Sequence, residues 1–367
     1  MSSGLFVSNE NDTNCGGVYS FFDQQSNDFS FIYPEITGYF LSTIKFLNDL
    51  ENDPKYSLYG KYSSDWLIKI YEKYGAIIQG IKSDTPTSNF SYSFDSAICA
   101  KGLLDYYEIS KNNRYLDYAK KILSELRNES IESDGTIMPF KDIKTNKLHE
   151  SNDVWYKQKG CLHIKVAMPF FQINQYLDND DNLSVGKKIC DTITNFQNPD
   201  GSIRLHSHSK IINLHTLCYA LEGLVYGYSV TKNDKYLQSS QKAVDWCLTK
   251  ISNDGSISLW HNSKYKSKAA YPIAQLIRIL ILIDKINDTS NYKSYVEQLY
   301  KFLMTLQASN PSPKINAGFY EEFYKSILGW KKRMRLNSWT SMFALQAIDW
   351  YGNYDNIKFD EQINFLY

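Results

Sequence analysis

The sequence of 367 residues has no excess of charge of either sign, because forty Lys and Arg balance forty Asp and Glu. A broad nucleic-acid surface needs a clustered excess of Lys and Arg. The chain also has no apolar run near the roughly 20 residues that a membrane helix requires. Its most apolar stretch, residues 276–283, is far shorter and predicts a buried helix. These absences predict a protein with no nucleic-acid partner and no membrane insertion.

Targeting segments and linkers are also missing. Residues 1–10 contain no basic segment followed by an apolar one, which a secretory signal peptide requires. We therefore expect a cytoplasmic protein. No Pro-, Gly- or Ser-rich linker, charge block or change of composition divides the chain. The sequence predicts a single domain over residues 1–367, with residues 1–33 as a non-helical N-terminal lead-in.

The six cysteines lack the close spacing of a metal site. Cys99, Cys190, Cys218 and Cys247 lie among apolar neighbours in helical patterns. That placement is typical of small buried side chains in a reducing compartment. A zinc site would need Cys or His ligands close together in the sequence. We therefore expect no metal and no cofactor.

The sequence does contain a repeated short motif. Asp-Gly, followed by Ser or Thr and then Ile, occurs at residues 134–137, 200–203 and 254–257. Each copy follows an amphipathic helical stretch and precedes another helix. Repetition at a period of roughly 50–70 residues indicates an array of equivalent units. Glycine tolerates the positive φ of a type I′ turn, and Asp nearly so, so we expect small β-hairpins in these loops.

Apolar residues recur with a period near 3.6 in successive stretches, which predicts helices. The expected helices span about 34–49, 64–81, 95–110, 114–127, 164–177, 184–196, 214–230, 234–251, 269–286, 292–306 and 338–351. Helices at odd places in this order are apolar on several faces, whereas those at even places are amphipathic and rich in Lys. A helix that is apolar nearly all round is buried. The odd helices should therefore form an inner layer.

The connections between these helices alternate in length. Short loops join each odd helix to the next even one, and long loops join each even helix to the next odd one. Short connections make antiparallel neighbours, so all inner helices point the same way and the long loops gather at their N-terminal ends. Six inner helices closed into a ring predict an all-α fold, an (α/α)6 barrel or toroid of helical hairpins, with short β-hairpin loops at one rim. An open solenoid of hairpins is the alternative.

This arrangement predicts a catalytic site in the funnel formed by the N-termini of the inner helices. The candidate catalytic residues there are Glu35, Asp95, His215 and Glu322. The helix dipole favours an ionised Glu35 and a neutral His215, and burial beside aromatic residues would raise the pKa of Glu322. Glycoside hydrolysis uses two such carboxyl groups. Glu35 or Asp95 would be the base or nucleophile, Glu322 the acid, and His215 a hydrogen-bonding partner of the sugar ring.

Other residues of the same rim are candidates for substrate binding. Trp260 and Trp339 would stack on sugar rings, and Arg333 and Arg335 suit an anionic group such as a uronate. The remaining candidates are Tyr33, His163, His261, Glu321 and Trp330.

Several of these candidate residues also have a purely structural explanation. Asp95 is also a typical helix cap, and Glu35 a carboxylate that helps to start its helix. The basic run around Arg333 is equally typical of a solvated surface, and Trp260 of a loop anchor.

Three segments carry a resemblance to a known group of proteins. They are residues 33–39 (YPEITGY), 215–224 (HTLCYALEGL) and 337–346 (NSWTSMFALQ). Together with the paired helices and the Asp-Gly loops, they are similar to the six-hairpin glycosidase-like superfamily of (α/α)6 barrels, above all to uncharacterised prokaryotic, polysaccharide-associated members. The resemblance implies a carbohydrate-active enzyme with a glycoside hydrolase-like or lyase-like action.

Two alternatives stay open. The N-acylglucosamine 2-epimerase family shares this barrel and works through paired histidines, an arrangement that His163 and His215 could imitate. The resemblance to that family implies a sugar 2-epimerase or isomerase. The third possibility is a non-catalytic glycan-binding or scaffold protein of polysaccharide biosynthesis. All three imply a carbohydrate as the partner, and none of them fixes the oligomeric state.

Overall fold

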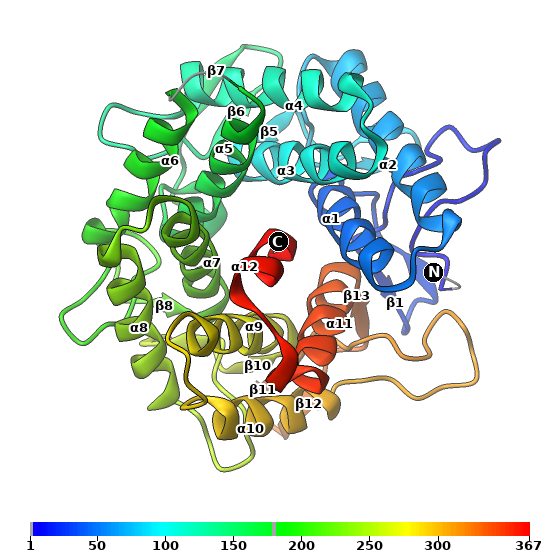
Figure 1. Ribbon diagram of the computed structural model, residues 1–367. Coiled ribbons are helices and arrows are strands. Elements are labelled where there is room, and N and C mark those ends of the chain that lie inside the picture. The colour runs from blue at the N-terminus through cyan, green and yellow to red at the C-terminus, as the bar shows by residue number, and fades with distance from the viewer. Residues whose placement is uncertain (1–2, 178–180) are drawn as a thin grey trace.

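The computed structural model describes residues 3–177 and 181–367. Its helices form two concentric layers around one axis (Figure 1). The inner layer contains α1 (Pro34–Glu51), α3 (Ser93–Ser110), α5 (Ala167–Ile173), α7 (Leu214–Thr231), α9 (Ala270–Ile286) and α11 (Ser338–Gly352). The outer layer contains α2 (Pro54–Tyr74), α4 (Asn113–Glu125), α6 (Asp181–Asp191), α8 (Asp234–Leu248) and α10 (Lys293–Met304).

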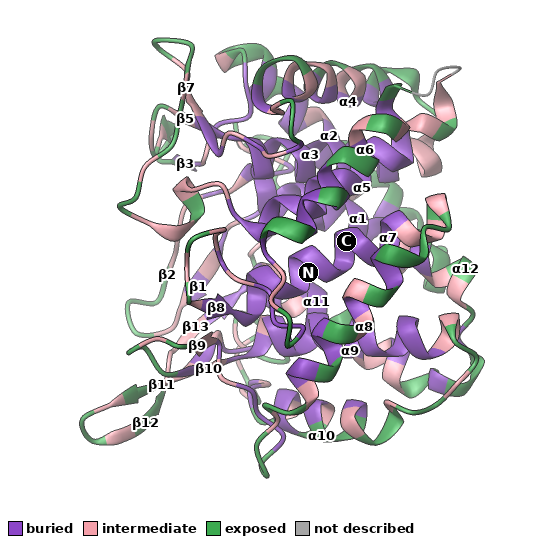
Figure 2. Cartoon of the chain, turned by 90° about the vertical axis from the view of Figure 1, so that its left-hand side faces the viewer, coloured by how far each residue is buried: buried purple, intermediate pink, exposed green. Residues whose placement is uncertain are grey.

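The inner layer is a closed ring. Each inner helix packs against the inner helix that follows it, and α11 packs back against α1. The predicted (α/α)6 barrel is therefore confirmed, and the open solenoid is excluded. Figure 2 shows the consequence for burial, since the inner helices are buried along most of their length and the outer helices expose one face. No helix within residues 3–177 and 181–367 combines the length and the apolar character needed to cross a bilayer.

The turns from inner to outer helices share one local design. The inner helices α1, α3 and α7 each end at a residue in the left-handed region, respectively Asn52, Lys111 and Lys232. In each case the next residue is Asp or Asn, and its side chain accepts a hydrogen bond from a backbone N–H in the first turn of the outer helix. Asp and Asn are among the preferred caps. So short a connection leaves the two helices antiparallel.

Short antiparallel sheets lie at the other end of the barrel (Figure 2). The sheets are β1 (Phe21–Asp23) with β2 (Asp28–Phe29) and β13 (Arg335–Asn337); β3 (Ile81–Lys82) with β4 (Thr85–Pro86); β5 (Phe90–Tyr92) with β6 (Phe140–Asp142) and β7 (Lys147–His149); β8 (Ile212–Asn213) with β9 (Trp260–His261); and β10 (Ser267–Ala269) with β11 (Glu322–Ser326) and β12 (Gly329–Lys332). Strands β5, β8, β10 and β13 run directly into α3, α7, α9 and α11. The sheets therefore position the N-termini of the inner helices.

The Asp-Gly turns differ in type from the prediction. Gly135, Gly201 and Gly255 have φ of 86°, 88° and 78°, but the preceding Asp residues do not have positive φ. A type I′ turn needs positive φ at both central residues. The Asp carboxylate instead accepts a hydrogen bond from the backbone N–H two residues on, at 2.9, 3.0 and 3.1 Å. These loops are therefore Asx-stabilised turns that end in a left-handed glycine.

Helix α2, the fifth helix and α6 depart from their predicted ranges, and α6 spans Asp181–Asp191 where 184–196 was predicted. Helix α2 begins at Pro54, ten residues before the predicted start, because Asp53 caps it and its first turns are too polar for apolar periodicity to reveal. Gly75, in the left-handed region, ends it before the apolar residues Ile77, Ile78 and Ile81. The fifth helix begins as a 3-10 helix, Cys161–Val166, and becomes α-helical as α5. Pro169 has no N–H for the carbonyl of Lys165, which interrupts the α-helical hydrogen bonds there.

The end of the barrel opposite the sheets is closed by the last residues of the chain. Helix α12 (Phe359–Gln362) and the turn after it lie at the centre of the ring in Figure 1. Lys45 donates to the carbonyl of Asn364 at 3.0 Å, and Gln346 donates to that of Phe365 at 2.8 Å. Tyr367 is fully buried. A ligand that reaches the inner-helix N-termini therefore approaches from the sheet end.

Candidate active site

The candidate site lies where the inner helices begin. Tyr33 immediately precedes α1, Glu35 lies in its first turn, and Asp95 lies in the first turn of the neighbouring α3. Both carboxyl groups are buried. The cap of α3 is Tyr92, so the explanation of Asp95 as a helix cap is wrong. Oδ2 of Asp95 is buried with no hydrogen-bond partner among the described residues, which is rare for a polar atom inside a protein.

The two carboxyl groups are close enough for the charge of Glu35 to act on Asp95, and the Tyr33 hydroxyl influences the pKa of both. Burial raises the pKa of Glu35 to about 7, although Tyr33 and Lys165 act in the opposite direction. Burial and then the charge of Glu35 raise the pKa of Asp95 well above its usual range, again against a hydrogen bond with Tyr33. The dipole of α1 favours an ionised Glu35, which was the prediction from the sequence. Burial has the larger effect on the pKa of Glu35 and raises it. Since two neighbouring like charges resist joint ionisation, the pair holds a proton near neutral pH.

His215 lies in the first turn of α7, and a chain of hydrogen bonds sets its tautomer. Its Nδ1 lies 2.6 Å from Oε1 of Gln275, whose Nε2 lies 3.2 Å from a carboxylate oxygen of Glu222. An ionised carboxylate only accepts hydrogen bonds, so the amide of Gln275 donates to Glu222 and its oxygen faces His215. Nδ1 of His215 therefore carries the proton. Burial lowers the pKa of His215 to about 3, so the ring is neutral and Nε2 is a free acceptor.

This chain continues into the barrel through charged groups that sequence analysis did not select. Glu222 contacts Lys165 at 2.6 Å with one oxygen and Arg278 at 2.5 Å with the other, and all three side chains are fully buried. The ammonium of Lys165 also lies over the rings of Tyr39 and Tyr219, 4.8 and 4.5 Å from their centroids. Buried charges persist when they are paired in this way. The positive charge of Lys165 reaches Glu35 and favours its ionised form.

Aromatic side chains connect these polar groups to the rim. The ring centroid of His215 lies 4.1 Å from that of Tyr219 and 4.6 Å from that of Tyr271. Tyr271 lies 6.1 Å from Trp339, in the first turn of α11. Tyr219 is close enough to Glu35 that the carboxylate, after burial, contributes to its raised pKa. The structure thus brings Glu35, His215 and Trp339 into one cluster through two tyrosines that the sequence analysis missed.

A hollow lies near this cluster, and Glu322 in its lining is close enough to Tyr271 to influence the pKa of that tyrosine. The hollow has a volume of about 440 Å³ and is lined by Trp260, Lys264, Tyr265, Lys266, Ser267, Glu322, Tyr324, Lys325 and Arg333. Burial raises the pKa of Tyr271 strongly, and the charges of Glu321 and Glu322 add to the effect. Trp260 and Glu322, which the sequence analysis assigned to one site, both line this hollow.

The charges around the hollow are arranged differently from the prediction. Arg333 is paired with Glu322 at 2.8 Å, and Arg335 is paired with Asp23 at 3.3 Å. Both arginines therefore have a carboxylate partner within the chain before any anionic substrate arrives. Burial, and then the charge of Glu322, raise the pKa of Glu321 to about 7. Glu321 thus has the property that sequence analysis assigned to Glu322, which is already engaged by Arg333.

His163 interacts with its own segment and with a neighbouring loop. It lies in the 3-10 helix before α5, and its Nδ1 is 3.3 Å from the backbone N of Gly160. Burial lowers its pKa to about 4, and the neighbouring His206 lowers it further. The interactions found for His163 thus run to Gly160 and His206, on the loop side of the helix. A pairing of His163 with His215 has no support in these contacts.

Two other predicted binding residues lie toward the outside of the barrel. His261 packs on Trp246 of the outer helix α8, with 5.0 Å between ring centroids. Trp330, on β12, is 44% exposed and lies against Lys268 and Lys325. Their roles in substrate binding stay predictions.

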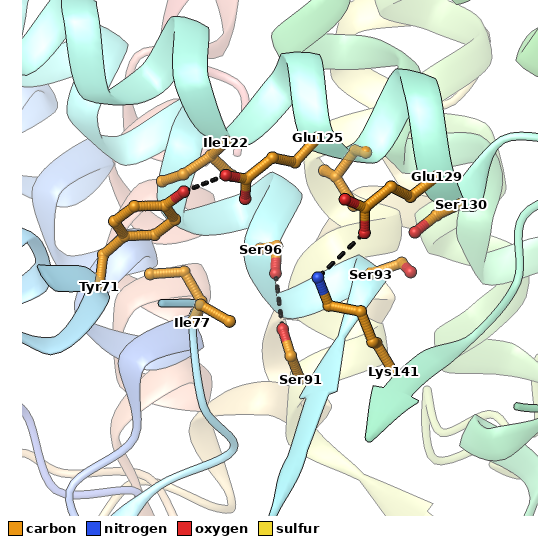
Figure 3. Close-up of a pocket in the computed structure, with 12 residues that line it drawn as sticks. Tyr71, Ile77, Ser91, Ser93, Ser96, Ile122, Glu125, Glu129, Ser130 and Lys141 are labelled. Carbon is orange, nitrogen blue, oxygen red and sulfur yellow. Dashed lines mark hydrogen bonds and ion pairs between the residues drawn. The ribbon is translucent and has the colours of Figure 1, made fainter. Parts of the chain in front are cut away.

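A separate small cavity lies outside the inner ring, between α2, α4 and the strands β5 and β6 (Figure 3). Its polar lining includes a hydrogen bond between Tyr71 and Glu125, an ion pair of 2.9 Å between Lys141 and Glu129, and a group of serines. The cavity has room for about 30 Å³, which suits a water molecule and excludes a sugar. Within residues 3–177 and 181–367, we find no cluster of three or more His, Cys, Asp or Glu arranged to hold a metal.

No family model matches the sequence, and no curated protein matches it either. Solved structures do resemble the fold. Cellobiose 2-epimerase from Bacillus thermoamylovorans B4167 is 13% identical, with a TM-score of 0.77 and coverage of 94% of this chain and 95% of that one. A D-mannose isomerase is 10% identical, with a TM-score of 0.77 and coverage of 97% and 96%.

A third solved structure adds a hydrolase to the two isomerising enzymes. An unsaturated glucuronyl hydrolase specific for heparin is 12% identical, with a TM-score of 0.69 and coverage of 95% of this chain and 94% of that one. Likeness at such low identity concerns architecture alone. The chain shares the (α/α)6 architecture of these three structures, and its sequence predicts that fold.

Proposed function

We propose that the protein is a carbohydrate-active enzyme that acts by general acid/base catalysis on a sugar bound at the sheet end of the barrel. The observation that carries this proposal is the buried pair Glu35 and Asp95, near the Tyr33 hydroxyl, with Oδ2 of Asp95 unpartnered among the described residues. Buried carboxyl groups with raised pKa values are typical of catalytic sites. The names of the similar structures, which are enzymes acting on sugars, agree with it.

The pair can cleave a glycosidic bond in the standard way. The protonated carboxyl group donates its proton to the leaving oxygen while the carbon–oxygen bond breaks. The ionised partner either removes a proton from an attacking water or attacks the anomeric carbon itself. Tyr33 can exchange its hydrogen bond between the two groups as their charges change. A lyase-like reaction would use the same pair, with the ionised group removing a carbon-bound proton.

The surrounding aromatic residues are suited to hold the sugar. Tyr271 and Trp339 present partly exposed rings beside His215. Trp260 lies farther out, in the 440 Å³ hollow, where additional sugar units would fit. Aromatic faces stack on sugar rings and exclude water from the reacting bond. This arrangement favours an oligosaccharide, with its reacting bond at the carboxyl pair and its remaining units toward the hollow.

The test is turnover of a glycan panel, including unsaturated uronides, by the parent and by Glu35→Gln and Asp95→Asn. We expect each substitution to lower kcat by about 100-fold or more, because each removes an acid or base from the reaction. Glu129→Gln, in the outer cavity of Figure 3, is the matched control and should leave kcat unchanged. Unchanged turnover in the double variant would rule out the proposed roles. Binding of a glycan without any product by mass spectrometry would instead indicate a binding protein.

His215 supports a second candidate, epimerisation or isomerisation of a sugar. Its neutral ring, with the proton fixed on Nδ1, leaves Nε2 as a base that could remove a carbon-bound proton. This reaction in deuterated water places deuterium on a sugar carbon, whereas hydrolysis does not exchange carbon-bound hydrogen. Deuterium incorporation that is lost in His215→Gln would favour the second candidate over the first.

A further inference from the structure

The hairpin of β11 and β12 projects from the sheet end of the barrel (Figure 2). Its turn consists of two adjacent apolar residues, Ile327 and Leu328, which are 102% and 80% exposed. Trp330 and Tyr265 lie near this turn and are also exposed. Single exposed apolar residues are common on soluble proteins. Two strongly exposed ones at a projecting tip, with two exposed aromatic residues nearby, indicate a surface that meets a partner.

The same region carries free positive charge. Four exposed lysines, Lys264, Lys266, Lys325 and Lys331, make no ion pair with any residue that the structure describes. They belong to the β11–β12 hairpin and to the loop before β10. The nearby arginines and acids are already paired with one another. The exposed tip is therefore surrounded by cations whose charge is not compensated within the chain.

We propose that this hairpin docks the protein on an anionic lipid bilayer. Ile327 and Leu328 enter the boundary between headgroups and acyl chains, Trp330 and Tyr265 lie at headgroup level, and the four lysines bind lipid phosphates. The sequence predicts no membrane insertion because no apolar run can span a bilayer. A hairpin tip needs no such run, since it reaches only the interfacial layer.

The strand arrangement disfavours a second copy of the chain as the partner. In the sheet β10–β11–β12, the projecting hairpin contributes β12 as an edge strand. Its sequence, Gly-Trp-Lys-Lys, places two lysines on that edge. Charged edge strands, Lys above all, prevent pairing with other strands. A lipid surface complements both the lysines and the apolar tip, whereas another lysine-rich edge complements neither.

Docking would also orient the molecule. The hairpin leaves the same end of the barrel as the strands that lead into α3, α7 and α9 (Figure 2). The candidate active site would thus face the bilayer, which suits a glycan carried at a membrane surface. The lipid-binding property itself is independent of the catalytic proposal and is measured without turnover.

The experiment is flotation of the purified full chain with two kinds of vesicle. One kind is phosphatidylcholine alone, and the other also contains phosphatidylglycerol. We expect binding to the anionic vesicles that weakens as salt is raised, because salt screens the lysines. The double variant Ile327→Ser and Leu328→Ser should lose about 10-fold or more of this binding. Leu50→Ser with Leu58→Ser, at two exposed leucines on the helical wall, is the matched control.

The charge is tested with Lys325→Gln and Lys331→Gln, which should each weaken binding by about 5-fold. Lys144→Gln and Lys147→Gln on the β6–β7 hairpin, another rim hairpin with exposed lysines, should bind as the parent does. Three results would overturn the proposal: no binding to anionic vesicles, equal binding by the tip variant, or a tip variant that changes only a monomer–dimer equilibrium. Equally tight binding of soluble anionic oligosaccharides that displaces the vesicles would assign the lysines to a glycan instead.

Discussion

At the residue scale, the chemistry of this protein depends on where folding places ordinary carboxyl groups. Glu35 and Asp95 are short acidic side chains in the first turns of two neighbouring helices, a position that normally stabilises a carboxylate. Here the ring closes over them, so burial dominates and their pKa values rise. A raised carboxyl pKa means that the folded state holds its proton more tightly than the unfolded chain. The resulting pair offers an acid and a base at neutral pH, and it lowers the stability of the fold there.

That lower stability gives a prediction for Glu35. Its pKa of about 7 in the folded state lies above the usual 4.5. The stabilisation from the protonated group is therefore complete below about pH 4.5 and is lost as the pH rises through about 7. Glu35→Gln, which cannot ionise, should be more stable than the parent at pH 8 by about 1–3 kcal/mol, with a smaller difference at pH 5. Urea unfolding at both pH values measures this, and a difference that does not depend on pH would contradict it.

A second residue-scale prediction concerns the tautomer of His215. Gln275→Leu removes the acceptor that holds the proton on Nδ1, while keeping a buried side chain of similar size. We expect the ¹⁵N spectrum of His215 to change from one tautomer to a mixture, and activity to fall by about 10-fold, because Nε2 is then protonated in part of the molecules. Gln172→Leu is the control, since Gln172 is equally buried but binds Asp105 and Glu108. An unchanged spectrum in Gln275→Leu would show that Gln275 does not set the tautomer.

The sequence predicted the site residues at the starts of the inner helices better than those deeper in the barrel. Glu35, Asp95 and His215 stand next to turn signals at helix starts, so their position could be deduced. Glu222 and Arg278 lie two turns deeper in helices that look apolar all round, and their partners come from other repeats. A usable signal existed, because His215, Tyr219 and Glu222 recur at helical spacing on one face. Pairing across the barrel, however, depends on the order of helices around the ring, which a single sequence does not provide.

At the scale of the element, the Asp-Gly repeat is explained by packing between units. A Cβ atom added to Gly135, Gly201 or Gly255 would lie 2.2–2.3 Å from a backbone carbonyl oxygen of α6, α8 or α10, respectively. Each turn therefore rests directly on the next outer helix. The Asp forms the turn, and the glycine permits both its positive φ and this close approach. The repeated motif thus marks the places where one helical hairpin docks on the next.

This explanation predicts the cost of a single methyl group. Gly201→Ala adds a Cβ to a residue with φ of 88° and places it 2.2 Å from the carbonyl oxygen of Lys242. Gly75→Ala is the matched control, because its φ is 70° and its Cβ would meet nothing within 4 Å. In the control, left-handed strain alone should lower the free energy of unfolding by about 1–2 kcal/mol. In Gly201→Ala, the backbone clash should lower it by roughly a further 1–2 kcal/mol. Equal losses in urea unfolding would show that the turn does not dock through its glycine.

At this scale, the sequence predicted which helices exist better than it predicted where each helix begins and ends. Helices α7 and α9 directly follow strands β8 and β10, and they start within a residue of expectation. Helix α2 starts earlier than periodicity indicates, because its first turns are polar and its cap, Asp53, is the stronger signal. The π-helical turn Leu126–Ser130 after α4 has no sequence signal that we recognise.

At the scale of the whole molecule, the barrel encloses a column of charges where a hydrophobic core would be expected. Glu222, Lys165 and Arg278 come from three different inner helical segments and are fully buried. Arg278 also donates to Gln346 at 2.7 Å and to the carbonyl of Tyr367 at 3.1 Å. The column thus joins the site at one end of the barrel to the segment that closes the other. Its integrity requires more than one helical hairpin, since Glu222 lies on α7, Arg278 on α9 and Lys165 in the 3-10 helix before α5.

The last prediction follows from this column. Glu222→Gln leaves two buried cations, Lys165 and Arg278, facing each other without a negative partner, which should lower the free energy of unfolding by about 3–5 kcal/mol. Glu222→Gln with Arg278→Met removes one cation as well and should recover part of that loss, because a buried pair can be replaced by apolar groups at smaller cost. Glu297→Gln breaks an exposed pair with Lys301 on α10 and should have no measurable effect. If the double variant were as unstable as Glu222→Gln alone, repulsion between unpaired cations would not be the cause, and the loss would lie in the hydrogen bonds that Glu222 makes with Gln275 and Lys165.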